Sequence, residues 1–106
     1  MDNFNENLTR FVAYAQGLID NNFKVNGYVA AGMPVPQLTL DPGTKYIRIV
    51  SDDGRPYSRS VFGFVDKTNG NVLKAAGWKA PAKHARGNIA DVDYKCATPW
   101  GIVYLR

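Results

Sequence analysis

An apolar stripe over residues 5–22 constrains the fold of this chain more than any other feature. The apolar residues recur at the i, i+3, i+4 and i+7 spacing that lines one face of an α-helix. A stripe of this kind must be buried against another element, and the chain that follows consists of short β-type runs. The sequence therefore predicts one amphipathic helix that packs on a sheet. The residues of the stripe are Leu8, Phe11, Val12, Ala15, Leu18 and Ile19.

Residues 44–76 carry the signature of three antiparallel strands. The side chains alternate in character over residues 44–50 and 57–65, and Asn69-Gly70 is a strong signal for the next turn. We therefore predict a meander of three strands and an α+β fold. The length of 106 residues fits a single domain.

Shorter β-type runs are expected on both sides of the meander. Asn26-Gly27 is typical of a hairpin turn, so we predict one strand before it at 23–25 and one after it at 28–30. A brief edge strand is expected at 38–40. A last strand within 100–105 would close the sheet.

The formal net charge of +4 is unevenly distributed along the chain. Residues 43–90 contain nine basic and three acidic residues, whereas the rest of the chain has a net charge of −2. No carboxylate lies between Asp66 and Asp91. A solvated surface normally mixes both signs. The acid-free stretch, with a basic loop at about 77–90, therefore predicts a surface that meets polyanions, nucleic acid above all.

Two groups of side chains are candidates for nucleic-acid contact. In the basic stretch, lysine and arginine would neutralise phosphates, and Trp78 would offer a ring for an unstacked base. In the meander, the pattern Tyr-x-Arg occurs twice and places a ring and a guanidinium on one face of each strand. If the two strands pair, these four side chains share one sheet face, a platform found in single-strand binders. The alternatives are that Trp78 lies in the core and that the meander side chains cover the core edge with solvated tips. The predicted contacts are Lys74, Trp78, Lys79, Lys83 and Arg86, together with Tyr46, Arg48, Tyr57 and Arg59 on the strands and Arg55 in the loop between them.

Few features suggest catalysis, a metal or a membrane. His84 is the only histidine, and the single cysteine, Cys96, fits a small buried residue and excludes an internal disulfide. Asp52 and Asp53 beside Gly54 fit turn chemistry, and no Walker A, GxGxxG or EF-hand motif is present. No window is apolar enough for a membrane span, and the acidic start differs from a secretory signal. We expect a cytoplasmic protein that is not an enzyme, with no cofactor or metal.

Part of the sequence resembles small bacteriophage proteins. The similarity lies in FVDKTNGNVLKAA at 64–76, WKAPAK at 78–83 and RGN at 86–88. Some small phage proteins bind single-stranded DNA during replication or early transcription. The resemblance implies sequence-independent coating of single-stranded DNA by a homo-oligomer inside the infected host.

Other interpretations of the resemblance stay open at this point. A phage structural or assembly protein would turn the basic patch toward an acidic partner or the packaged genome. A host-directed inhibitor would dock on a bacterial enzyme. Self-association would use the helix surface around Phe4 and Phe11 or the final strand.

Overall fold

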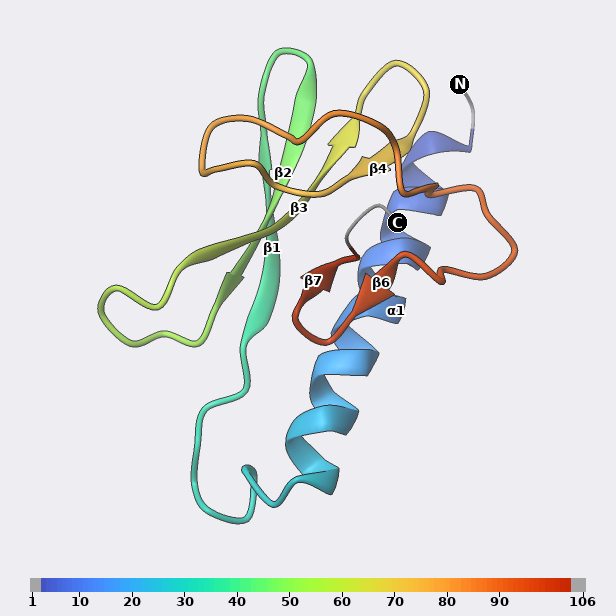
Figure 1. The fold of residues 1–106 in the computed structure, drawn as a ribbon. Coiled ribbons are helices and arrows are strands. Elements are labelled where there is room, and N and C mark those ends of the chain that lie inside the picture. Colours follow the sequence, from blue (N-terminus) through green and yellow to red (C-terminus); the bar gives the residue numbers. More distant parts are fainter. Residues whose placement is uncertain (1–2, 104–106) are drawn as a thin grey trace.

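The structure is a computed structural model that describes residues 3–103. One long helix packs on an antiparallel sheet of five strands, and a small hairpin formed near the C-terminus lies beside the helix (Figure 1). The predicted α+β arrangement, with its N-terminal helix and central meander, is confirmed.

Helix α1 (Phe4–Val25) contains the predicted apolar stripe and buries it against the sheet. Leu8, Phe11, Ala15 and Ile19 are buried, and Phe11 and Ala15 have no exposed surface at all. The helix surface around Phe11 is therefore used by the core and is not available for self-association. The rest of the core comes from the sheet and the C-terminal segment: Ile47, Ile49, Phe62, Val65, Val72, Ile89, Tyr94, Cys96 and Ile102.

The predicted hairpin around Asn26-Gly27 is wrong, because this dipeptide ends the helix. Gly27 adopts a φ of 76°, which a residue without a Cβ tolerates at little cost. The backbone N–H of Tyr28 then donates to the carbonyl of Phe23 at 2.9 Å, and that of Gly27 donates to Lys24 at 3.2 Å. The rings of Phe23 and Tyr28 pack edge to face at 5.2 Å. These bonds and the ring contact form a Schellman motif, which satisfies carbonyls that the helix end leaves free.

The main sheet has the strand order β1-β2-β3-β4-β5, and all neighbours are antiparallel. Its edge strand β1 contains the strand predicted at 38–40, and β2, β3 and β4 form the predicted meander. The turn at Asn69-Gly70 is confirmed as the connection between β3 and β4. The strands are β1 (Gln37–Pro42), β2 (Tyr46–Asp52), β3 (Ser60–Asp66), β4 (Asn71–Leu73) and β5 (Gly87–Asn88).

A β-bulge in β3 breaks the strict alternation that we predicted over residues 57–65. The pairing of β2 with β3 skips one residue, so Phe62 has no partner on β2. Phe62 joins the core beneath α1, whereas Phe64 pairs with Arg48 and is buried outside that core. Residues 57–59 also lie before β3 rather than in it. A bulge of this kind re-aims side chains, which the sequence period does not reveal.

The C-terminal segment forms a separate two-stranded sheet from β6 (Ala97–Thr98) and β7 (Gly101–Ile102). The prediction that a last strand closes the main sheet is wrong for residues 100–103, and residues 104–105 lie outside the described part of the chain. The hairpin packs its Ile102 on the sheet instead. A Cβ added at Gly63 of β3 would lie 2.6 Å from Cγ1 of Ile102.

Candidate nucleic-acid interface

The sheet face opposite α1 carries a row of side chains that runs from β1 to β4. Asp41, Arg48, Phe64 and Leu73 are direct neighbours in the strand register. Residues in register project from the same face of a sheet. Arg48 and Asp41 form an ion pair in this row, while Phe64 and Leu73 are buried. The row therefore places an ion pair beside two buried apolar side chains.

The arm, defined as residues 74–82, leaves β4 and folds back on itself. Ala75 bridges to Pro81, and the N–H of Ala82 donates to the carbonyl of Lys74 at 2.7 Å. In Figure 1 this orange segment crosses the upper strands of the sheet. The fold-back makes Trp78 the tip of the arm and brings it to the face that carries Arg48.

Trp78 lies on the surface and contacts two arginines. The guanidinium carbon of Arg48 is 4.8 Å from the centre of the Trp78 ring, and that of Arg59 is 5.3 Å away. Nε of Arg48 also donates to the backbone carbonyl of Trp78 at 2.8 Å. Trp78 is 40% exposed, so the alternative that it belongs to the core is wrong. Exposed cation–π contacts contribute only about 0.5–1 kcal/mol, so a ligand ring would displace the exposed guanidinium of Arg59 at little cost.

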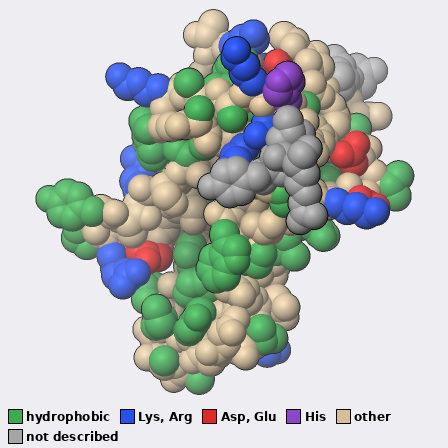
Figure 2. All heavy atoms as spheres, in the orientation of Figure 1, with side chains coloured by type: hydrophobic (Ala, Val, Ile, Leu, Met, Phe, Trp, Pro, Cys, Tyr) green, Lys and Arg blue, Asp and Glu red, His purple; other side chains and the backbone are tan. Residues whose placement is uncertain are grey.

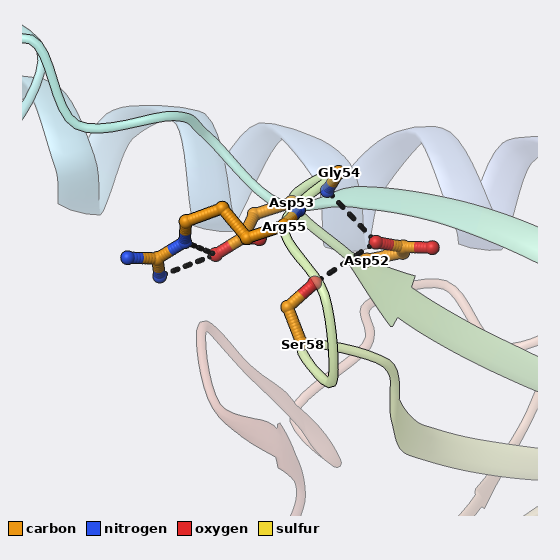
Figure 3. A network of polar contacts seen from close by, with 5 residues as sticks. All are labelled: Asp52, Asp53, Gly54, Arg55 and Ser58. Atoms are coloured by element: carbon orange, nitrogen blue, oxygen red, sulfur yellow. Dashed lines mark hydrogen bonds and ion pairs between the residues drawn. The ribbon is translucent and has the colours of Figure 1, made fainter.

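The finger, defined as residues 52–59, connects β2 to β3 and projects from the sheet at the left of Figure 1. Figure 3 shows how its acidic residues organise it. The carboxylate of Asp52 accepts hydrogen bonds from the N–H of Gly54 at 2.8 Å and from the hydroxyl of Ser58 at 3.0 Å. The carboxylate of Asp53 accepts from the backbone and the guanidinium of Arg55, and these bonds hold the pKa of Asp53 well below its usual range. Asp52 and Asp53 thus act as turn residues, as the sequence suggested.

Tyr57, in the finger, is the most exposed aromatic side chain of residues 3–103. Its backbone has a φ of 62°, a left-handed conformation that is uncommon for a non-glycine residue. Its side chain is fully exposed. Throughout residues 3–103 the Tyr57 ring makes no contact with another ring or with a cation. The bonds around Asp52 and Asp53 therefore hold a ring whose two faces are open to solvent.

The basic residues differ in whether a carboxylate compensates their charge. Each arginine of β2 and the finger has an acidic partner, whereas no ion pair within the described chain involves Lys79 or Lys83. The three pairs are Arg48 with Asp41, Arg55 with Asp53, and Arg59 with Asp52, the last at 3.7 Å. Figure 2 shows Lys and Arg side chains around the upper part of the molecule, while its lower end carries few charges. The uncompensated positive charge in this part of the surface therefore comes from Lys79 and Lys83.

The structure brings together only part of the predicted set. Arg48, Arg59 and Trp78 form one cluster, and Lys79 follows Trp78 at the tip of the arm. Tyr46 shares the outer face of β2 with Arg48, but Tyr57 lies in the finger, so the expected row of four side chains on one sheet face does not form.

Two of the predicted basic residues are tied into the fold. Nζ of Lys74 donates to the carbonyl of Ile102 at 2.9 Å. Nη1 of Arg86 donates to the carbonyls of Lys83 and His84, which holds the chain that follows the arm. Sequence reasoning missed Asp41, because its pairing with Arg48 depends on the register between β1 and β2.

Three further features of residues 3–103 concern metal ions, the single thiol and the membrane. No group of three His, Cys, Asp or Glu side chains in this range is arranged to hold a metal ion. Cys96 is buried as expected, and burial raises the pKa of its thiol. Within the same range, α1 is too polar to cross a membrane.

Comparisons with known proteins give a family and no function. No curated protein and no solved structure matches the chain. The sequence model of one family, described as a family of unknown function, matches residues 3–98 and so includes the helix, the main sheet, the finger and the arm. The chain therefore belongs to this family of unknown function, DUF7717.

Proposed function

We propose that this protein binds single-stranded nucleic acid without sequence preference. The observation that carries the proposal is the meeting of Trp78 with Arg48 and Arg59 beside the uncompensated Lys79. Cations beside aromatic rings are the combination with which proteins track a phosphate backbone and stack bases. The solvent-exposed ring of Tyr57 adds a second stacking position on the adjoining finger.

In the proposed complex, lysines contact the phosphates and aromatic rings stack the bases. Lys79 and Lys83 are exposed and would neutralise phosphates, which releases counterions and gives affinity for any sequence. Tyr57 would stack a base directly, whereas a base at Trp78 would replace one of the two guanidiniums. Stacking on either ring requires an unstacked base, so single strands would be preferred over duplex.

We further propose that the preferred strand is DNA and that the protein binds it as a homo-oligomer. Both parts of this proposal rest on the resemblance to small phage proteins. An oligomer would extend the track and raise the apparent affinity through multivalency. Phe11 does not serve as its contact surface, because the core buries this side chain completely. A cytoplasmic location and a non-enzymatic role belong to the same proposal.

The test measures affinity for oligothymidine, for duplex DNA and for RNA at a low and a moderate salt concentration. We expect the single strand to bind most tightly and its affinity to fall steeply as salt rises. Reversing the charge of Lys79 and Lys83 to glutamate should weaken binding to all sequences. The matched control reverses Lys24 and Lys95, two exposed lysines outside residues 74–83, and should weaken binding much less. Affinity that does not change with salt, or an equal loss in both variants, would overturn the proposal.

A further inference from the structure

A hollow of about 260 Å³ opens between the turn from β1 to β2 and the tip of the arm. The turn residues 43–45 form one wall, and Tyr46 and Phe64 line the sheet side. Lys79 from the arm lines the hollow as well. Its volume lies just below the range of about 300–1,000 Å³ that is usual for small-molecule sites. The hollow is thus large enough for one small polar group with part of the molecule that carries it.

The lining of the hollow offers several hydrogen-bond donors to an anion. Lys45 and Lys79 contribute ammonium groups, and neither forms an ion pair with any residue from 3 to 103. The backbone N–H groups of Thr44 and Lys45 and the hydroxyl of Thr44 donate no hydrogen bond within that range. Backbone N–H groups of a turn combined with lysines are a common way to bind phosphate.

One carboxylate also lines the hollow, and its charge is already compensated. Asp41 pairs with Arg48, and Arg48 is itself among the lining residues. This pair contributes no net charge, so the two lysines determine the sign of the potential in the hollow. Nζ of Lys45 also lies 5.3 Å from the centre of the Tyr46 ring, which holds the lysine against the wall.

We propose that the hollow binds the terminal phosphate of a nucleotide, a phosphomonoester. The inference rests on the proposed function, because the Trp78 cluster beside the hollow would hold the strand whose end enters it. A phosphomonoester carries close to two negative charges at neutral pH and has three oxygens that accept hydrogen bonds, whereas an internal phosphodiester carries one charge.

The test compares a short oligothymidine with a 5′-phosphate, the same strand with a 3′-phosphate, and the strand with neither. The wild-type protein should bind one of the phosphorylated strands about tenfold more tightly than the strand without a phosphate, the effect of one charge-assisted contact. Thymidine monophosphate is added as a competitor in a further arm. If thymidine monophosphate competes as well as the phosphorylated strand does, the phosphate site is supported and its ligand is a free nucleotide. If thymidine monophosphate competes more weakly, the ligand is the strand end.

Variants of the turn separate this inference from the general proposal. Thr44→Val combined with Lys45→Gln should abolish the preference for the phosphorylated strand and leave most of the affinity for the other strand. Lys95→Gln removes one exposed lysine elsewhere and should keep the preference. Equal binding of all three strands by the wild-type protein, or a preference that survives in the turn variant, would overturn the inference while the general proposal stands. If no strand binds at all, the proposed function and this inference both fail.

Discussion

Replacing Tyr57 with alanine would separate base stacking from charge at the interface. The ring is fully exposed and contacts no ring or cation of residues 3–103, so its loss should change the free energy of unfolding by less than about 0.5 kcal/mol. Alanine at a φ of 62° has the same backbone strain as tyrosine, so backbone strain should not change the free energy of unfolding of the variant. A stacked base contributes about 1–3 kcal/mol. The Kd for oligothymidine should therefore rise by about 5- to 150-fold.

The assay is a fluorescence anisotropy titration of labelled oligothymidine, with a urea titration to measure stability. Tyr57→Phe keeps the ring and should bind like the wild type. Because neither change removes a charge, the slope of log affinity against log salt should stay the same in both variants. An unchanged Kd for the alanine variant would refute the stacking role. A large loss of stability would refute the view that the finger presents a ring without packing it.

The packing and titration of other residues lead to further expectations. Gly63→Ala should lower the free energy of unfolding by about 1–3 kcal/mol in a urea titration, because its Cβ would meet Ile102 at 2.6 Å. Gly17→Ala on the open helix surface should raise it by about 0.5–1 kcal/mol in the same titration. Cys96 should resist alkylation until urea unfolds the protein, as mass spectrometry would show, because burial raises the pKa of its thiol. Hydrogen bonds from Thr68 lower the pKa of Asp66, so their stabilising effect should be complete above the unfolded pKa of about 3.9 and be lost as the pH falls through the lower folded pKa, as melts at decreasing pH would show.

The fold was predictable where a side-chain period extended over several turns or residues. The stripe of α1 and the alternation in β2 are such signals, and the structure has both elements. Asn26-Gly27 misled the prediction, because the same left-handed glycine that makes a hairpin turn also ends a helix. The bulge at Phe62 had no signal in the sequence, since it depends on how β3 is paired and packed rather than on the local period.

The sequence predicted which residue types the candidate site contains, but not which of these residues contact one another. The basic stretch around Trp78 and Lys79 stands out in the sequence because it contains no acidic residue. The carboxylate beside Arg48 comes from Asp41, seven positions earlier in the chain, and only the register of β1 with β2 brings the two together. Tyr57 was expected beside Arg48 on the sheet, but the strand begins later than its alternation indicated and leaves Tyr57 in the finger.

The cations of the candidate interface differ in whether a carboxylate neutralises them, and this difference indicates which of them would bind phosphate. Arginines such as Arg48 and Arg59 hold the Trp78 ring and have carboxylates nearby, so a phosphate that approached them would compete with an existing partner. Lys79 and Lys83 face no such competition within the described chain. The salt-dependent part of the affinity should therefore come mainly from the lysines, since each phosphate they neutralise adds about 0.9 to the salt slope of duplex DNA and about 0.7 to that of a single strand. Arg48 and Arg59, which lie outside the acid-free stretch, instead fix the position of the Trp78 ring. The stretch is therefore informative because of Lys79 and Lys83 rather than its total charge.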